Sequence, residues 1–279
     1  MNRRRFIKIV TGAVGVSAAA GVATPLYAHY VEPYWLSVEK HKLHFPDVSK
    51  PPVGLRIIQL SDIHRSGIVP DSYIIRCVSE VNSLKPNMVV LTGDYITLSR
   101  KWADGLNNVL KPLTAKLGVY ACLGNHDGGN WAGFGTSSIK EELEKAGIQV
   151  LVNERVNLVW HGREFSLVGL GDLLARQFAP QTVLKGTSED QFTIALSHNP
   201  DTLRQLEEYH ANLILCGHTH GGQVNIPLIG PPILPVEDKQ YSAGFYKLGD
   251  KLVYVNRGVG LLKKVRFNCR PEIACFDVM

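Results

Sequence analysis

Side chains that bind metals recur directly after short apolar runs of this 279-residue sequence. They fall into five groups: Ser61-Asp62-Ile63-His64, Thr92-Gly93-Asp94, Gly124-Asn125-His126-Asp127, Ser197-His198-Asn199 and Gly217-His218-Thr219-His220-Gly221-Gly222. Carboxylates and imidazoles together suit manganese, iron or zinc better than calcium. The glycines beside them permit tight turns and close approach of a substrate. The pattern therefore indicates a metal centre assembled from distant parts of the chain.

Two metal ions would need a ligand that both can share. An aspartate at a strand end can give one oxygen to each ion, and Asp94 is the natural candidate. Ions about 3.5–4 Å apart would hold both the attacking and the leaving oxygens of a displacement, with a metal-bridging hydroxide as the nucleophile. The sequence contains no Gly-x-Ser-x-Gly or Gly-x-x-x-x-Gly-Lys motif, which would have indicated other chemistry.

Each group alone also has a plain structural explanation. A Gly-Asp pair is usually a turn, Asn-His-Asp after a strand can cap a helix, and a single histidine can be a satisfied loop residue. Gly-His-Thr-His-Gly-Gly is more specific, because two histidines flanked by glycines pack poorly. The occurrence of all five groups in one chain favours the metal centre.

Buried strands alternating with helices must position these groups. Strands are predicted at 55–60, 87–91, 119–123, 150–152, 158–160, 165–170, 192–196, 213–216, 252–256 and 273–278, and helices at 72–84, 104–117, 137–146 and 201–208. So many strands exceed one open sheet, so we expect two packed mixed β-sheets flanked by helices, a four-layer α/β/β/α sandwich. Ligands bind beyond the carboxyl ends of such strands, which places all five groups on one rim.

The order of these motifs also carries a family resemblance. Asp-x-His, Gly-Asp, Gly-Asn-His-Asp, His and Gly-His-x-His together resemble the calcineurin-like metallophosphoesterase superfamily over residues 53–279. The stretches LCGHTHGGQV and PVEDKQY, the latter beginning at Pro235, are similar to its YaeI/YkuE-type phosphodiesterases. The resemblance implies a binuclear centre of divalent ions, with every expected ligand position filled.

The resemblance also implies a role for each residue. It assigns the first metal to Asp62, His64, Asp94 and His220, and the second to Asp94, Asn125, His198 and His218. His126 would protonate the leaving oxygen or steady the phosphate charge. Asp127 would orient His126.

The N-terminus predicts export. Arg3-Arg4-Arg5-Phe6-Ile7-Lys8 precedes an apolar stretch up to about Ala23, the layout of a secretory signal, and resembles a twin-arginine signal. Residues 1–28 are therefore expected to be an export signal or an uncleaved membrane anchor, 29–52 a linker and 53–279 the phosphoesterase domain. A periplasmic location, or one on the outer face of the cytoplasmic membrane, follows. The twin-arginine machinery would be a partner, and membrane association stays open.

Charge and cysteine content exclude other classes. The formal net charge is +5, and three of the positive charges are the arginines Arg3, Arg4 and Arg5 of the signal, so no nucleic-acid partner is indicated. The five cysteines show no CxxC pair, which argues against a disulfide framework, while pairing of Cys269 with Cys275 stays open. The segment 261–267 mixes apolar and basic residues and favours a basic strand edge over a contact with anionic lipid.

The sequence thus predicts a metal-dependent phosphoesterase, most simply a phosphodiesterase. An envelope enzyme that cleaves a lipid-linked nucleotide pyrophosphate, of the UDP-diacylglucosamine type, is the alternative, and a non-catalytic metal-binding scaffold is a weaker one. Trp131 and Phe134 lie in a glycine-rich stretch after the third group, where they form either an aromatic substrate rim or a plain surface loop.

Overall fold

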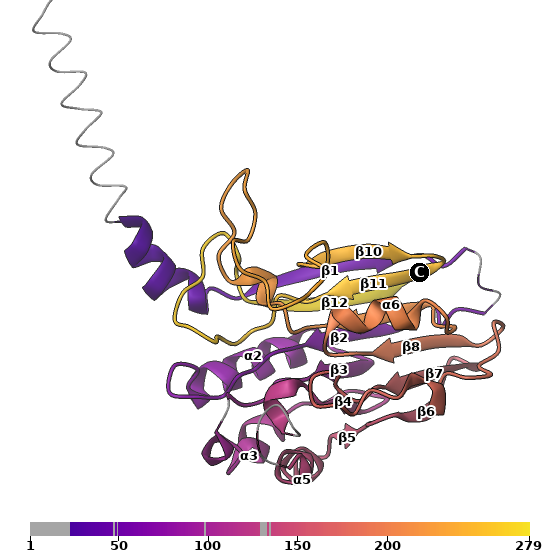
Figure 1. Ribbon diagram of the computed structural model, residues 1–279. Helices are drawn as coiled ribbons and strands as arrows, with labels where there is room; N and C mark the ends of the chain where they lie inside the picture. The colour runs from indigo at the N-terminus through magenta and orange to yellow at the C-terminus, as the bar shows by residue number, and fades with distance from the viewer. Residues whose placement is uncertain (1–22, 47, 49, 98, 129–132, 134) are drawn as a thin grey trace, which may run out of the picture.

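Two mixed β-sheets form the centre of the molecule. The computed structural model describes residues 23–46, 48, 50–97, 99–128, 133 and 135–279 (Figure 1). The first sheet has the strand order β1-β12-β2-β3-β4-β5. Its strands are β1 (Ser37–Leu43), β2 (Arg56–Leu60), β3 (Met88–Thr92), β4 (Val119–Cys122), β5 (Gln149–Val150) and β12 (Glu272–Val278). All neighbours run parallel except β12 and β2.

The second sheet has the order β10-β11-β9-β8-β7-β6. Its strands are β6 (Glu154–Trp160), β7 (Arg163–Gly169), β8 (Phe192–Leu196), β9 (Leu213–Cys216), β10 (Gly244–Leu248) and β11 (Lys251–Val255). The outer pairs β6·β7 and β10·β11 are antiparallel, and the inner pairs are parallel.

Alternation along the strands creates the layers. Successive side chains of a strand point to opposite faces, so Ile57 packs into the cluster between the sheets and Ile58 into the cluster under the outer helices. In the second sheet, Ile194 faces the first sheet and Ala195 faces outward. Both faces of both sheets are therefore covered, and the predicted four-layer α/β/β/α sandwich is confirmed.

The helices cover the outer faces of the sheets. They are α2 (Asp71–Ser83), α3 (Leu106–Leu110), α5 (Ser137–Lys145) and α6 (Leu203–Leu206). The first three contribute to the cluster on the first sheet, and α6 contributes to that on the second.

Two of the predicted helices are shorter than expected. The helix predicted at 104–117 is reduced to α3, because Gly105 takes a left-handed conformation (φ 77°) before it and Pro112 follows it. The helix predicted at 201–208 becomes a 3₁₀ turn, Pro200–Thr202, followed by α6.

The segment predicted as a linker, 29–52, contains β1. This strand pairs in parallel with β12, Ser37 opposite Glu272, so that strands from the two ends of the chain lie side by side (Figure 1). A short helical segment, Tyr27–Val31 and Glu32–Tyr34, precedes it. Of the predicted signal, residues 1–22 lie outside the described part of the chain. Within the described part, no helix combines the length and apolarity needed to span a bilayer.

All five cysteines are free and buried. In the structure, therefore, Cys269 does not pair with Cys275. Burial raises the pKa of the Cys77 thiol to about 12, which leaves it protonated and unreactive at neutral pH.

Candidate metal centre

The five motif groups follow strands of both sheets. The groups beginning at Ser61, Thr92 and Gly124 follow β2, β3 and β4, and those at Ser197 and Gly217 follow β8 and β9. The backbone turns at once, because five of the polar residues have positive φ: Asp62, His64, Asp94, His218 and His220. Such non-glycine conformations concentrate at functional sites, where surrounding contacts hold them in place.

Glycines allow these turns to approach one another. A Cβ on Gly93 would lie 2.6 Å from Nδ1 of His198 and 2.7 Å from the backbone nitrogen of Gly124. A Cβ on Gly217 would lie 2.0 Å from Oγ of Ser61. The turns of the two sheets can therefore meet at this rim only because glycine, which has no Cβ, occupies these positions.

The predicted ligands form overlapping clusters. There are three such clusters, and within each one the ligand atoms of the side chains lie within 4.8 Å of one another. The clusters are Asp62 with His64 and His220, His64 with Asp94 and His126, and Asp94 with His198 and His218. All of these side chains are buried. The structure therefore brings together every predicted aspartate and histidine of the metal centre.

Asp94 lies between the clusters. Its Oδ2 is 3.5 Å from Nε2 of His64 and 3.2 Å from Nε2 of His198. Its Oδ1 accepts a hydrogen bond of 2.8 Å from the backbone nitrogen of His126. One carboxylate thus contacts imidazoles from both sheets, which is the placement that a shared ligand needs.

Several buried polar atoms lack a hydrogen-bond partner, and their chemistry fits divalent metals. Oδ1 of Asn125 has no hydrogen-bond partner, and Nε2 of His198 has only its 3.2 Å ion-pair contact with Oδ2 of Asp94. Leaving such atoms unpaired costs about 1–3 kcal/mol each, so a cation that binds them would remove the penalty. A donor set of two aspartates, one asparagine and four histidines suits manganese, iron or zinc.

Backbone carbonyls set the tautomers of two histidines. Nδ1 of His198 donates a 2.7 Å hydrogen bond to the carbonyl of Thr92, so Nε2 is the nitrogen left for a metal ion. Nε2 of His218 donates to the carbonyl of Pro235 at 2.9 Å, which leaves Nδ1 as the free ligand atom. These contacts orient both rings before any ligand binds.

Burial keeps the remaining imidazoles neutral. Desolvation lowers the pKa of His64 to about 3 and that of His218 to about 4, so both offer unprotonated nitrogens at pH 7. Burial would raise the pKa of Asp94, but the neighbouring His198 and other imidazoles hold it well below its usual range. At neutral pH the centre therefore contains an ionised Asp94 and neutral His64 and His218, whereas the carboxylates around His198 raise its pKa well above the usual value, so that this ring must lose a proton when it binds a metal ion.

Asp127 acts on the backbone of the centre. Its Oδ2 accepts hydrogen bonds from the backbone nitrogens of Asp94 (2.8 Å) and Gly124 (2.7 Å), and its Oδ1 accepts one from Tyr95 (2.7 Å). It thus ties the turn after β3 to the turn after β4. Its predicted action on the His126 ring remains a prediction.

Two residues that support the centre had not been singled out from the sequence. Arg266 is fully buried and donates to the carbonyls of Arg257, Gly258 and Gly260. The segment that it holds presses on Asp62, since a Cβ on Gly258 would lie 2.6 Å from that of Asp62. The segment 261–267 was expected to be a basic edge, and it instead places one of its cations in the interior.

Asp172 is the second such residue. It is buried after β7, and its Oδ2 has no hydrogen-bond partner. Its charge is among those that raise the pKa of His198, which burial alone would lower. An isolated Gly-Asp in the sequence gives no sign of this placement.

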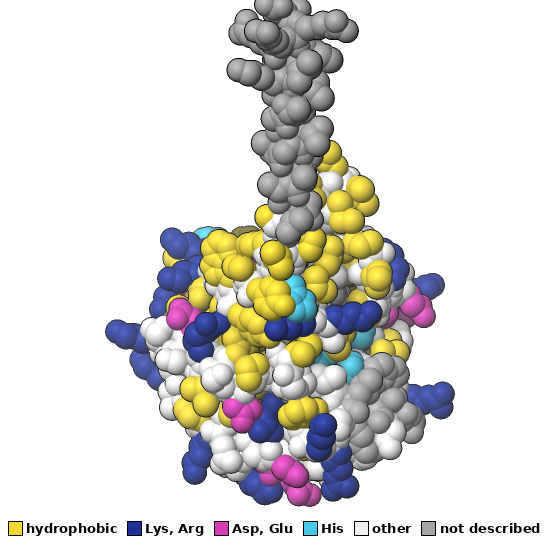
Figure 2. Space-filling view, turned by 90° about the vertical axis from the view of Figure 1, so that its left-hand side faces the viewer, with side chains coloured by type: hydrophobic (Ala, Val, Ile, Leu, Met, Phe, Trp, Pro, Cys, Tyr) yellow, Lys and Arg dark blue, Asp and Glu magenta, His cyan; other side chains and the backbone are white. Residues whose placement is uncertain are grey.

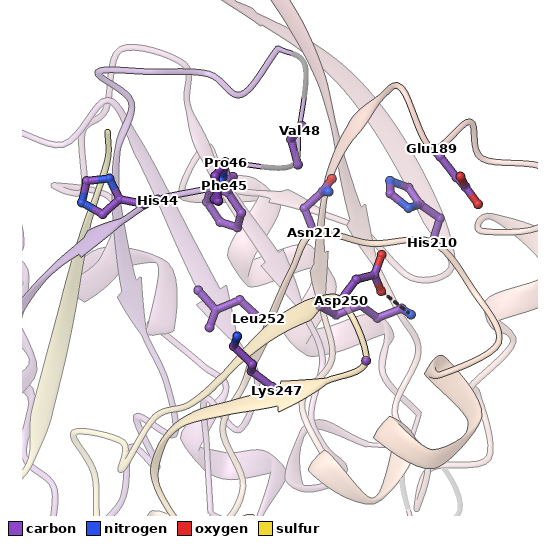
Figure 3. A pocket seen from close by; sticks show the side chains of 12 residues that line it. His44, Phe45, Pro46, Val48, Glu189, His210, Asn212, Lys247, Asp250 and Leu252 are labelled. Carbon is purple, nitrogen blue, oxygen red and sulfur yellow. Dashed lines mark hydrogen bonds and ion pairs between the residues drawn. The ribbon is translucent and has the colours of Figure 1, made fainter.

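A pocket of about 360 Å³ lies away from the metal centre. Its lining includes His44, Asn212 and Lys247, as Figure 3 shows, and none of the predicted metal ligands. Asn212 immediately precedes β9, whereas the ligand His218 follows that strand. The pocket and the centre therefore lie at opposite ends of β9. Trp131 and Phe134, the proposed aromatic rim, lie outside the described residues.

Comparisons with known proteins agree with this geometry. The family model for calcineurin-like phosphoesterases matches residues 55–222, the span that holds all the predicted ligands. The chain is 36% identical to phosphodiesterase YaeI of Escherichia coli, with all of both chains covered. It is 32% identical to the uncharacterized metallophosphoesterase YkuE of Bacillus subtilis, covering 100% of this chain and 98% of that one.

A third relative carries a more specific name. The chain is 30% identical to UDP-2,3-diacylglucosamine pyrophosphatase LpxG of Chlamydia muridarum, covering 91% of this chain and 93% of that one. Together with the matched family model, these similarities mean that the chain is a hydrolase acting on phosphate ester bonds. The protein belongs to the calcineurin-like phosphoesterase family.

Proposed function

We propose that this protein is a phosphodiesterase that works with two divalent ions outside the cytoplasm. The observation that carries the proposal is the position of Asp94, whose single carboxylate lies between imidazoles of both sheets. Asp62, His64 and His220 would complete one ion site, and Asn125, His198 and His218 the other. Two bound ions would lower the pKa of a water molecule and neutralise charge on the phosphate.

His126 is the residue that we assign to proton transfer. It is buried beside His64, with the two ring centroids 4.8 Å apart. Burial lowers its pKa, so the ring is neutral at neutral pH and would take up the proton that the attacking water releases. From this position the ring would hydrogen-bond the leaving oxygen and pass that proton to it.

We further propose a lipid-linked substrate. The similarity to pyrophosphatase LpxG supports this class, while the greater similarity to phosphodiesterase YaeI favours a diester over a pyrophosphate. The arginine-rich start and the apolar stretch after it support export by a twin-arginine route and a location at the outer face of the membrane.

The test is hydrolysis by purified protein supplied with manganese. We expect turnover of bis-p-nitrophenyl phosphate to exceed that of p-nitrophenyl phosphate, with elemental analysis giving two ions per chain. UDP-2,3-diacylglucosamine, assayed in parallel, would reveal the pyrophosphatase alternative if it were cleaved faster than the diester. A protein that binds manganese and cleaves none of the three would contradict the proposal.

Two variants separate metal binding from proton transfer. His126→Ala should lower kcat about 10²–10⁴-fold and keep the metal content. Asp94→Ala should lose both metal and activity, because a shared ligand cannot be removed from one site alone. Equal metal loss in both variants would show that His126 acts as a ligand instead.

A further inference from the structure

A second pocket, apolar in character, opens directly beside the metal centre. Its volume is about 310 Å³, at the lower end of the range for small-molecule sites. Its lining includes Val224, Ile233, Leu262 and Val265, and it shares His220 with the metal centre. We propose that this pocket holds a hydrocarbon chain of an amphiphilic phosphate ester while its phosphate lies at the metal centre. The inference rests on the proposed function and names the part of the substrate that the fold selects.

The pocket is held in shape by polar contacts outside its apolar surface. The side chain of Gln223 donates to the carbonyls of Lys263 and Val265 and accepts from the backbone nitrogen of Leu262. One wall, residues 262–265, is thereby attached to the turn that carries His220. A preformed wall costs less ordering entropy when a ligand binds.

A second wall is attached to the metal centre itself. Residues 232–235 form this wall, and the carbonyl of Pro235 accepts the hydrogen bond from Nε2 of His218. Close packing fixes its base, since a Cβ on Gly222 would lie 2.5 Å from Cβ of Pro231. Both walls are thus fixed to the turns that carry His218 and His220. A hydrocarbon chain held between them would therefore have a fixed position relative to the phosphate at the metal centre.

The surface around the pocket favours an amphiphile. Ile233 is 76% exposed and Leu262 39%, and the nearby Leu228 and Ile229 are also exposed. Figure 2 shows hydrophobic side chains gathered on the upper part of the face in view, with lysine and arginine side chains around them. Lys263 lines the pocket, where its charge would attract an anionic head group while the apolar wall takes the chain.

The test is equilibrium binding of non-hydrolysable alkylphosphonates to the full-length, manganese-loaded protein. Ethyl, butyl, hexyl and octyl phosphonates are titrated by calorimetry below their micelle-forming concentrations. We expect Kd to fall about three- to fourfold for each added methylene that the pocket covers, the factor given by the transfer of a CH₂ from water. A Kd independent of chain length overturns the proposal.

A matched pair of variants locates the effect. Ile233 lines the pocket, and Ile233→Asn should abolish most of the dependence of Kd on chain length. Leu228→Asn makes a similar change on the same loop, at a residue that is fully exposed and outside the lining, and should keep it. Equal behaviour of the two variants contradicts the assignment. Because binding is measured without turnover, a loss of chain dependence is distinct from a failure to hydrolyse esters.

A vesicle experiment identifies the source of the chain. Phosphatidylcholine vesicles with and without a long-chain phosphonolipid are sedimented with wild type and with Ile233→Asn. Extra sedimentation caused by the phosphonolipid, and reduced in Ile233→Asn, indicates a ligand taken from a bilayer. Chain-dependent Kd values without this increase indicate a dissolved amphiphile.

Discussion

Arg266 shows how a single buried cation can support the metal centre without touching it. Its guanidinium has no exposed surface and donates to four backbone carbonyls, those of Arg257, Gly258, Gly260 and Cys269. Backbone nitrogens of the same segment donate to Ser61 and Asp62, at 3.0 Å from Val259 and 2.7 Å from Gly260. The position of the first predicted ligand therefore depends on this segment.

Replacing Arg266 by methionine should destabilise the fold and weaken metal binding. Buried carbonyls that lose their donors cost about 1–3 kcal/mol, and we expect a loss of at least this size in urea denaturation. The control is Arg270→Met, whose partially exposed guanidinium donates to the carbonyls of Trp35 and Leu36. A smaller loss is expected there, since water can replace those bonds. Equal effects would contradict a special role for Arg266.

At the scale of elements, the turn after β3 must pass very close to the turn after β4. Gly93 has φ 89°, and an added Cβ would meet His198 and Gly124 at less than 3 Å. Gly147 has a similar φ of 80° with nothing within 4 Å. The two glycines thus share the same backbone strain and differ in the space around them.

Gly93→Ala should therefore lower manganese affinity at least tenfold, because the turn that carries Asp94 must move. Gly147→Ala should lower the free energy of unfolding by about 1 kcal/mol, from backbone strain alone, and leave manganese affinity unchanged. Metal titration and urea denaturation of both variants measure this. Similar metal affinities in the two would show that the close approach is unimportant.

Helix α2 begins with an ion pair that gives a pH-dependent contribution. The hydrogen bond from Arg65 lowers the pKa of Asp71 below its ordinary value of 3.8. A depressed carboxyl pKa stabilises the fold above the unfolded pKa, and this stability is lost as pH falls through the folded pKa. The side chain of Asp71 is 48% exposed, so screening limits the gain to less than about 1 kcal/mol.

Asp71→Asn should lower the free energy of unfolding slightly at pH 7. The difference from wild type should shrink below about pH 4, where Asp71 becomes protonated in the wild type as well. Urea denaturation at several pH values measures it. A difference that grows toward low pH would contradict the assignment, and high salt should reduce the difference at pH 7.

The sequence predicts the metal ligands more completely than it predicts the elements around them. Metal ligands keep a restricted set of residue types and follow apolar strands, so Asp62 through His220 are visible as motifs. Strand β1 is not, because its residues Ser37–Leu43 are mostly polar and partly exposed. The role of Arg266 cannot be predicted either. Its partners are backbone carbonyls, which every residue type has, so no sequence pattern indicates them. Helix ends were misjudged where Gly105 and Pro200 override helical periodicity.

At the scale of the whole molecule, the metal centre joins the two sheets. Its ligands follow β2, β3 and β4 of one sheet and β8 and β9 of the other. Ions that bind only the folded state stabilise it by mass action, by about 2.7 kcal/mol at a concentration one hundred times Kd. Metal should therefore contribute to overall stability as well as to catalysis.

Chelation should lower the midpoint of thermal unfolding, and added manganese should restore it. Calorimetry before and after treatment with EDTA measures the change. Asp94→Ala serves as the control and should respond to neither treatment. A midpoint that is unaffected by chelation in the wild type would mean that the ions bind the folded and unfolded chains equally.

The pairing of β1 with β12 has a consequence for synthesis of the chain. Strand β12 lies between β1 and β2 in the first sheet, although all the strands from β2 to β11 separate it from β1 in the sequence. During translation, β1 leaves the ribosome long before its partner β12 is made. Closing so large a loop is slow, and the first sheet is complete only after residue 278 has left the ribosome. A ribosome stalled anywhere before residue 272 would therefore carry a polypeptide whose first strand still lacks its neighbour.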